Sequence, residues 1–310
     1  MNKFFSTAIG MLALVAVLAA CGDDKEARQR LGRAERIRLM REDSAALKIA
    51  VMPTLDCLPV WVAKEAGIFD SLGLDARMRV VKSQMDVDQL LRKGKVEGAV
   101  TDLVRGQRLK RQGTELDYVA ATDARWTLVA NRNARIKTLK QLDDKMVAMT
   151  RFSATAWLTD KVNDSVKLKD ERVYQVQIND VDLRLAMLLG NEMDAAWLPE
   201  PHATVALAYR NVRLTDSRQA GLHPGVIGFR AELKGDSTRE RQISLFLKAY
   251  DMACDSITRR GTAHFAALME RKWKLRKGMA GKVSKDYRFP KAAPPKQEEI
   301  EKADKWLDKH

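Results

Sequence analysis

The chain has 310 residues, of which 45% are apolar, with 17 Gly and 8 Pro, a composition typical of globular and not of disordered proteins. This length exceeds what a single hydrophobic core usually supports, so two lobes are expected. The formal charge of +14 at pH 7 marks a strongly basic chain. Beyond the first twenty residues, no segment is long and apolar enough to predict a transmembrane helix.

Residues 1–20 have the pattern of an export signal. Lys3 supplies a positive flank, and the apolar run from Met11 to Ala20 ends in small residues directly before Cys21. A membrane-spanning helix needs about 20 apolar residues, so this run is too short. The ending Leu-Ala-Ala-Cys resembles a bacterial lipoprotein signal, in which the cysteine becomes the acylated first residue of the mature chain. The alternative is an ordinary secretory signal with an incidental cysteine.

The lipoprotein interpretation predicts a lipid anchor, such as palmitate, on Cys21 and a place in the cell envelope, on the extracytoplasmic side of a bacterial membrane (periplasm or cell surface). ATP, nicotinamide pools and nucleic acid are absent there. An anionic membrane surface is therefore the expected neighbour of the basic chain. The remaining Cys57 and Cys254 could form a disulfide in an oxidising compartment, but Cys254 lies in an apolar stripe at helical spacing. We expect buried thiols.

Four histidines, at positions 202, 223, 264 and 310, form no cluster with ligand spacing. The sequence therefore predicts no metal site and no cofactor.

Strands and helices alternate after a charged tether over residues 21–46. Pro59 fits the first turn of a helix and Gly67 its end. Strands are predicted at 47–52, 74–81 and 96–101, and helices at 59–66 and 87–93. This alternation indicates parallel sheets.

A weak internal sequence repeat, here called the internal echo, predicts two lobes of similar fold. Lys48-Ile-Ala-Val-Met resembles Lys145-Met-Val-Ala-Met, 97 residues later. Glu97-Gly-Ala-Val and Asp194-Ala-Ala-Trp show the same offset of 97. We predict lobe I over 47–128 and lobe II over 129–221. Residues 222–310 should then form a return crossing and C-terminal helices packed on lobe I, including a helix capped at Asp236.

Two segments carry a family resemblance. Residues 47–81 (LKIAVMPTLDCLPVWVAKEAGIFDSLGLDARMRVV) and 189–206 (LGNEMDAAWLPEPHATVA) resemble the hallmarks of the nitrate/sulfonate/taurine/thiamine-precursor (NMT1/THI5-like) group of ABC-importer substrate-binding proteins. The resemblance covers about residues 47–255, and the chain after Arg260 departs in length and charge. It implies a type II periplasmic-binding-protein-like α/β fold with mostly parallel sheets in two lobes. Two crossing segments would join the lobes, which close on a small ligand and deliver it to a membrane permease.

The ligand site is expected beyond the carboxyl ends of the strands. Thr54 and Asp56 follow the first strand, while Arg151, Ser153 and Thr155 follow its counterpart in the second lobe. A helix N-terminus near Ser153 favours an anion, and Arg151 could add a forked grip. The alternative is that Ser153 only caps its own helix.

Acidic and aromatic residues complete the predicted site. Asp102 and Glu200 end two further strands and would suit an amine, although both could simply complement helix dipoles. Tryptophans near turns could stack on a flat ligand. The predicted ligand-binding residues are Thr54, Asp56, Trp61, Asp102, Trp126, Arg151, Ser153, Thr155, Trp197 and Glu200.

These observations favour a monomeric, membrane-tethered carrier of an amine-bearing, zwitterionic or anionic organic ligand, either sulfonate/taurine-like or thiamine-pyrimidine-like. An enzyme on the same fold, of the pyrimidine-precursor synthase or dehydratase type, is one alternative. A ligand-sensing subunit is another. The chain lacks a cysteine cluster, a GxSxG elbow, an HExxH motif and a phosphate loop, so we do not expect an enzyme.

Overall fold

The computed structural model describes residues 32–168, 172–283 and 286–310. It divides into two units, one ending at Ala46 and one from Leu47 to His310. In the first unit, helix α3 (Arg33–Ala45) falls within the predicted tether and has no buried residue. The predicted signal peptide (residues 1–20) and Cys21 lie outside the described residues. Within the described residues, no helix has both the length and the apolarity that crossing a membrane requires.

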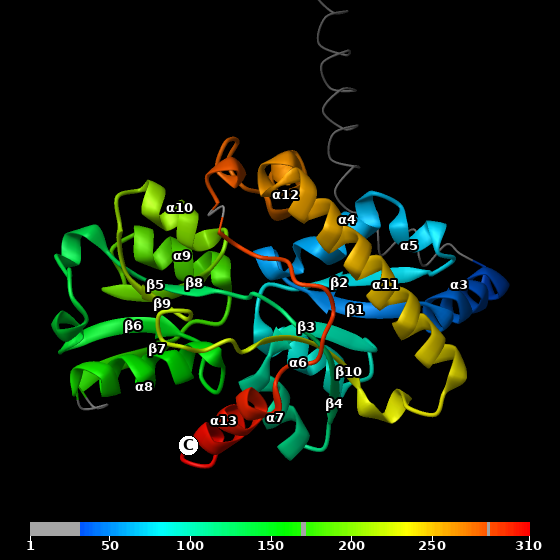
Figure 1. Cartoon of the computed structure of the whole chain (residues 1–310), viewed down its shortest axis with the longest axis horizontal. Coiled ribbons are helices and arrows are strands. Elements are labelled where there is room, and N and C mark those ends of the chain that lie inside the picture. The colour runs from blue at the N-terminus through cyan, green and yellow to red at the C-terminus, as the bar shows by residue number, and fades with distance from the viewer. Residues whose placement is uncertain (1–31, 169–171, 284–285) are drawn as a thin grey trace, which may run out of the picture. The chain divides into compact units, whose positions relative to one another are not determined.

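The second unit contains two sheets of five strands with equivalent topology (Figure 1). The first has the order β2-β1-β3-β10-β4 and defines lobe I; the second has the order β7-β6-β8-β5-β9 and defines lobe II. In each, a single strand, β10 or β5, runs antiparallel to its neighbours. The prediction of two α/β lobes with mostly parallel sheets is confirmed.

The strands of lobe I are β1 (Leu47–Val51), β2 (Ala76–Val80), β3 (Gly98–Asp102), β4 (Leu116–Ala121) and β10 (Gly225–Arg230). Those of lobe II are β5 (Trp126–Ala130), β6 (Lys145–Met149), β7 (Val173–Gln177), β8 (Ala195–Pro199) and β9 (Val212–Asp216).

The internal echo corresponds to this shared topology, because β1 and β6 occupy the same position in the two sheet orders, as do β3 and β8. The chain passes between lobes through two crossing segments, residues 122–125 and 217–224. Each crossing segment is hydrogen-bonded to the strand that adjoins the other segment. The Thr122 N–H donates to the Gly225 carbonyl oxygen at the start of β10 (2.9 Å), and the Ser217 N–H donates to the Trp126 carbonyl oxygen at the start of β5 (2.9 Å). Because β5 belongs to the second sheet, the chain leaves lobe I slightly before the predicted boundary at residue 128.

Local sequence signals explain where several helices begin and end. Pro59 lies in the first turn of α4, and Gly67 follows it with φ +66°, a conformation that glycine adopts at little cost. The Asp236 carboxylate accepts hydrogen bonds from the backbone N–H groups of Thr238 and Arg239 and so caps α11. The helices of lobe I are α4 (Leu58–Glu65), α5 (Ile68–Ser71), α6 (Gln84–Arg92), α7 (Leu103–Arg111), α11 (Ser237–Arg260) and α12 (Ala266–Trp273). Lobe II has α8 (Ala154–Val166), α9 (Val181–Leu189) and α10 (His202–Ala208), and the chain ends with α13 (Gln297–Leu307).

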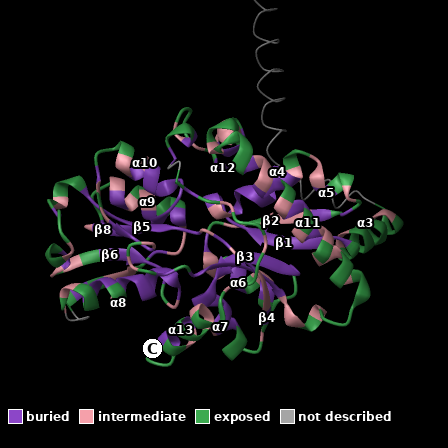
Figure 2. Ribbon diagram, viewed as in Figure 1, coloured by how far each residue is buried: buried purple, intermediate pink, exposed green. Residues whose placement is uncertain are grey.

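Hydrophobic cores surround both sheets, where the strands are largely buried (Figure 2), and the core around the lobe II sheet continues into lobe I through Leu103, Val104 and Val226. In lobe I, Phe246 of α11 packs against Phe69 and Phe229, with ring centroids 5.8 and 5.5 Å apart. Cys57 and Cys254 lie in the same core as free thiols. Burial raises the pKa of Cys254 to about 12 and that of Cys57 well above its ordinary value, so both are protonated at neutral pH.

Helix α13 contacts both lobes, whereas the sequence placed the C-terminal helices on lobe I. Arg111 of α7 pairs with Asp304 and Asp308, each at 2.7 Å. On the other side, Trp306 Nε1 donates to Asp160 Oδ2 of α8 (2.7 Å). The indole belongs to the hydrophobic cluster of lobe II, and its burial accounts for the second contact.

A substitution at Gly98 tests the packing of β3 against β10. A Cβ at this position would lie 2.5 Å from Phe229 Cδ1 and 3.0 Å from the Gly228 carbonyl oxygen. We expect Gly98→Ala to lower the free energy of unfolding by about 1–3 kcal/mol, measured by urea denaturation. Gly281→Ala is the control, since no heavy atom lies within 4 Å of its added Cβ. Equal stability of the two variants would contradict this packing.

Candidate functional site

A pocket lies between the lobes, where the carboxyl ends of strands from both sheets meet. Its remaining space is about 30 Å³, room for about one or two water molecules. The lining residues from lobe I are Met52, Thr54, Asp56, Gln84, Val100 and Thr101. Those from lobe II are Thr150, Asn179, Val181, Arg184 and Pro199, and Ala124, Arg125 and Trp126 come from the first crossing segment and the start of β5.

The two lobes are hydrogen-bonded directly to each other around this pocket. The Leu55 N–H donates to the Glu200 carbonyl oxygen (2.9 Å), and the Val181 N–H to the Lys82 carbonyl oxygen (3.2 Å). Lys82 Nζ also pairs with Asp182 Oδ2 (3.0 Å), across the lobes. The pKa of Asp182 is lowered to about 2, mainly by its hydrogen bond from His202 and further by Lys82. The structure therefore shows the lobes in contact, with little free space between them.

Arg105 of α7 makes a buried contact between the lobes. The residue is 1% exposed and forms an ion pair with Asp88 of α6. Its Nη1 donates to the carbonyl oxygens of Arg151 (3.2 Å) and Phe152 (3.3 Å) in lobe II. A charge taken out of water needs such compensation from a counter-ion and from hydrogen-bond acceptors.

Asp102 lies beside Arg105 and also joins the lobes. Its carboxylate caps α7 through the Arg105 N–H (3.0 Å), and it accepts from Gln84 Nε2 (2.7 Å) and from the Ala154 N–H of lobe II (3.2 Å). Burial raises its pKa to about 6, although these hydrogen bonds act in the opposite direction. The pKa of Asp88 is likewise raised by burial to about 6, against the opposing effect of Arg105.

The pocket contains a positive charge on its lobe II side. Arg184 of α9 is 2% exposed and donates to the carbonyl oxygens of Trp197 (2.8 Å) and Ile178 (2.9 Å from Nε) and to Thr150 Oγ1 (2.6 Å). All of these acceptors are neutral, and among the described residues no carboxylate forms an ion pair with it. Burial lowers its pKa to about 10, so the guanidinium stays charged at neutral pH.

A carboxylate lies on the lobe I side. Asp56 belongs to a short 3-10 turn, Leu55–Cys57, and is partly accessible, as expected for a pocket-lining residue. Burial raises its pKa, while hydrogen bonds from Thr54 and from nearby backbone N–H groups oppose the shift. The pocket thus holds an acidic and a basic side chain from opposite lobes.

Two donors in the pocket lining have no hydrogen-bond partner among the described residues, Arg125 Nε and Thr101 Oγ1. A buried donor without a partner costs about 1–3 kcal/mol. A ligand with acceptor oxygens would satisfy both groups.

The predicted site residues fall into three groups. Thr54, Asp56 and Trp126 line the pocket. Asp102, Ser153, Thr155 and Glu200 are buried where the lobes meet, and Ser153 caps α8 by accepting from the Thr155 N–H (3.1 Å). Trp61 and Trp197 pack in the hydrophobic clusters of the two lobes, and Arg151 is exposed beside an outer hollow.

The pocket is also lined by four polar residues that were not predicted from the sequence, Gln84, Arg125, Asn179 and Arg184. Arg184 carried a usable signal, because it is the single basic residue of an otherwise mostly apolar helix, Val181–Leu189. A charge at such a position is usually paired or functional when it is buried.

The two-lobed α/β fold with a pocket between the lobes is shared with periplasmic binding proteins. The chain belongs to the NMT1/THI5-like family, whose profile matches residues 54–224. The resemblance carried by residues 47–81 and 189–206 is therefore confirmed. No curated protein sequence matches the chain significantly.

Solved structures share the fold at low sequence identity. The periplasmic aliphatic sulphonate-binding protein SsuA from Escherichia coli is 17% identical, with a TM-score of 0.72 over 86% of this chain and 87% of that one. The alkanesulfonate-binding protein SsuA from Xanthomonas axonopodis pv. citri, bound to MOPS, is 15% identical, with a TM-score of 0.73 over 85% and 91%. The nitrate-binding protein NrtA from Synechocystis PCC 6803 is 14% identical, with a TM-score of 0.64 over 82% and 74%.

The two raised carboxyl pKa values predict a pH dependence of stability. Asp88 and Asp102 have pKa values of about 6 in the folded chain, against about 3.9 for an unperturbed aspartate. Between these values the folded chain binds more protons than the unfolded chain. The two residues therefore make the free energy of unfolding fall as pH rises from about 4 to 6.

Asp102→Asn should flatten this slope, measured by urea denaturation at several pH values between 4 and 7. Asp75→Asn is the control, because Asp75 forms an exposed ion pair with Arg77. Parallel profiles for Asp102→Asn and the unmodified chain would contradict the assignment.

Proposed function

We propose that this chain is the extracytoplasmic substrate-binding protein of an ABC importer and that its lobes close on a small anionic or zwitterionic organic ligand. The pocket between the lobes carries the proposal, since it combines Arg184, Asp56 and the unpartnered Arg125 Nε–H. The family supports this proposal, and so do the structural neighbours, which are binding proteins for sulfonates or nitrate and thus for anions.

The charges of the pocket define the ligand class. Arg184 and the Arg125 Nε–H would bind a sulfonate or carboxylate, since charge-assisted hydrogen bonds from guanidinium groups are strong. Asp56 on the opposite lobe would bind an ammonium group. A short zwitterion such as taurine can satisfy both sides at once, whereas a protonated pyrimidine would use Asp56 and the face of Trp126.

Ligand entry requires the lobes to part, since the present space holds only about one or two water molecules. In the open form, the contacts between Leu55 and Glu200 and between Asp102 and Ala154 are lost to water. A ligand that touches both lobes adds interactions available only to the closed form and therefore shifts the population toward it.

We propose a carrier rather than an enzyme. Glu200 and His202, an acid and a potential base two residues apart in the sequence, both make contacts within lobe II. Glu200 Oε2 accepts from the Thr204 N–H (3.1 Å), and His202 Nε2 lies 3.0 Å from Asp182 Oδ1. Steady turnover of a bound compound would overturn this proposal.

The carrier would act as a monomer tethered to the extracytoplasmic side of a bacterial membrane through lipid on Cys21, and it would deliver its ligand to the permease. The charged stretch that contains α3 would connect the anchor to the two lobes. Several acyl chains, at about 0.8 kcal/mol per buried methylene, would hold it firmly.

Asp56→Asn tests the ligand class, with taurine and ethanesulfonate as a matched pair that differs by the amine. We expect taurine to raise the melting temperature of the unmodified chain more than ethanesulfonate does. The variant should bind taurine about tenfold more weakly, because an ion pair is lost, and ethanesulfonate equally well.

Isothermal titration calorimetry measures both affinities. Equal weakening for both compounds would show that Asp56 does not recognise the amine. If nitrate, the sulfonates and hydroxymethylpyrimidine all failed to bind, the proposed function would be wrong.

Cys21→Ser tests the anchor. The variant should lose incorporation of labelled palmitate and move from the membrane to the soluble fraction, because no acyl chain is then attached. Its ligand affinity should be unchanged. Retention of the variant in the membrane would contradict lipid anchoring through this cysteine.

A further inference from the structure

Residues 286–296, here called the strap, lead to helix α13 and run along the crossing segments (orange to red in Figure 1). They lie beyond residues 54–224, the part that the family profile matches. The Ala293 carbonyl oxygen accepts from the Ala121 N–H at the end of β4 (2.7 Å), and the Arg288 N–H donates to Asp123 Oδ2 (2.8 Å).

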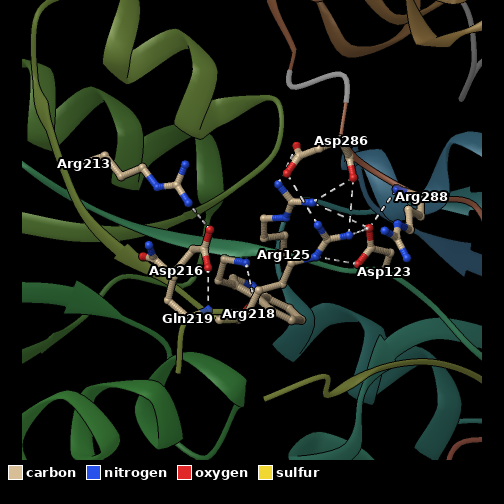
Figure 3. A network of polar contacts seen from close by, with 10 residues as sticks. Asp123, Arg125, Arg213, Asp216, Arg218, Gln219, Asp286 and Arg288 are labelled. Carbon is tan, nitrogen blue, oxygen red and sulfur yellow. Dashed lines mark hydrogen bonds and ion pairs between the residues drawn. The ribbon is translucent and has the colours of Figure 1, made fainter. Parts of the chain in front are cut away.

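Asp286 joins the strap to both crossing segments (Figure 3). Its Oδ1 accepts from Arg125 Nη1 in the first segment (2.9 Å), and its Oδ2 lies 3.5 Å from Arg218 Nη1 in the second. Asp123 completes the network, with Arg218 Nε at 3.2 Å from Oδ1 and Arg125 Nη2 at 3.7 Å from Oδ2. Two arginines and two aspartates therefore alternate around the point where the chain passes between lobes.

The strap also surrounds Arg125, which lines the ligand pocket and is 5% exposed. Tyr287 places its ring 5.3 Å from the guanidinium carbon, a cation–π contact. Arg125 Nη1 and Nη2 are engaged by Asp286 and Asp123, while Nε has no hydrogen-bond partner in the part of the chain that the structure describes. The orientation of this free N–H is thus fixed by the strap.

We propose that Asp286 is a positioning residue and that the strap is a hinge clamp. It holds the two crossing segments together and orients Arg125 for the ligand. The clamp follows from the contacts of the strap alone, and only the part concerning ligand recognition rests on the proposed function. Without the Asp286 carboxylate, the guanidinium groups of Arg125 and Arg218 would share one counter-ion and repel each other across the hinge.

Hydrogen exchange of the full, ligand-free chain tests the clamp. The reporters are the amides of Thr122 and Ser217, whose hydrogen bonds join one crossing segment to the strand beside the other. We expect Asp286→Asn to speed exchange of both by about threefold or more, because local opening becomes easier. Peptides from β6 and α8 should be unchanged. Asp286→Glu should restore slow exchange.

Two further variants sharpen the comparison. Arg218→Gln removes the same link from the other side and should also speed exchange at both reporters. Asp75→Asn removes an exposed aspartate–arginine pair on lobe I and should leave them unchanged. Unaltered exchange in Asp286→Asn, or acceleration spread evenly over the chain, would overturn the clamp.

The ¹⁵N resonance of Arg125 Nε provides a second readout that general loss of stability would not reproduce. Its chemical shift should change in Asp286→Asn, return to the original value in Asp286→Glu and stay unchanged in Asp75→Asn. An unchanged chemical shift in Asp286→Asn would overturn the positioning role. Both measurements need no ligand. A failed ligand screen would therefore refute the proposed function alone, whereas failure of these readouts would refute the clamp alone.

Discussion

The guanidinium of Arg105 extends from lobe I to two carbonyl oxygens of lobe II, and Asp88 compensates its charge. If the lobes part, Arg105 exchanges these carbonyl acceptors for water. An intramolecular hydrogen bond of a charged group contributes about 1.5–3 kcal/mol net, far less than the cost of leaving the guanidinium without acceptors. In the proposed carrier, a ligand that contacts both lobes would therefore be able to shift the population toward the closed form. The buried Arg105 guanidinium nevertheless keeps the closed geometry specific, because few relative positions of the lobes provide both its counter-ion and its hydrogen-bond acceptors.

The fold could be read from the sequence because its signals are local and repeated. β1 and β6 are short apolar strands that occupy matching positions in the two sheets. The similarity between segments 97 residues apart therefore reflects the shared topology of the two lobes. Pro59 and Gly67 mark the limits of α4 for purely conformational reasons, and Asp236 caps α11 in the expected way. The contacts of α13 with both lobes had no such signal. They depend on tertiary packing, which brings Trp306 within hydrogen-bond distance of Asp160 in α8.

The lining of the candidate pocket was predicted only in part, because side-chain direction is set by tertiary packing. Thr54 and Asp56 could be placed, since the end of a parallel strand leads to the edge of the sheet where a ligand binds. Ser153 caps its own helix, and the indole of Trp197 donates inward to Thr159 Oγ1 (3.0 Å). Arg184 reaches the pocket from the middle of a helix, and only its burial distinguishes it from a solvated arginine.

The charges that remain in the pocket explain why a ligand of either proposed class would favour closure. Burial disfavours the ionised form of Asp56 and also opposes the charge on Arg184, so each side chain is less stable than it would be in water. An anionic group next to Arg184 removes part of that cost, and an ammonium group next to Asp56 removes the other part. A zwitterion brings both groups without adding net charge to the buried site. In the proposed carrier, binding energy would thus come from relieving the unfavourable burial that the closed lobes impose, and it would be unavailable to an open form in which water solvates both groups.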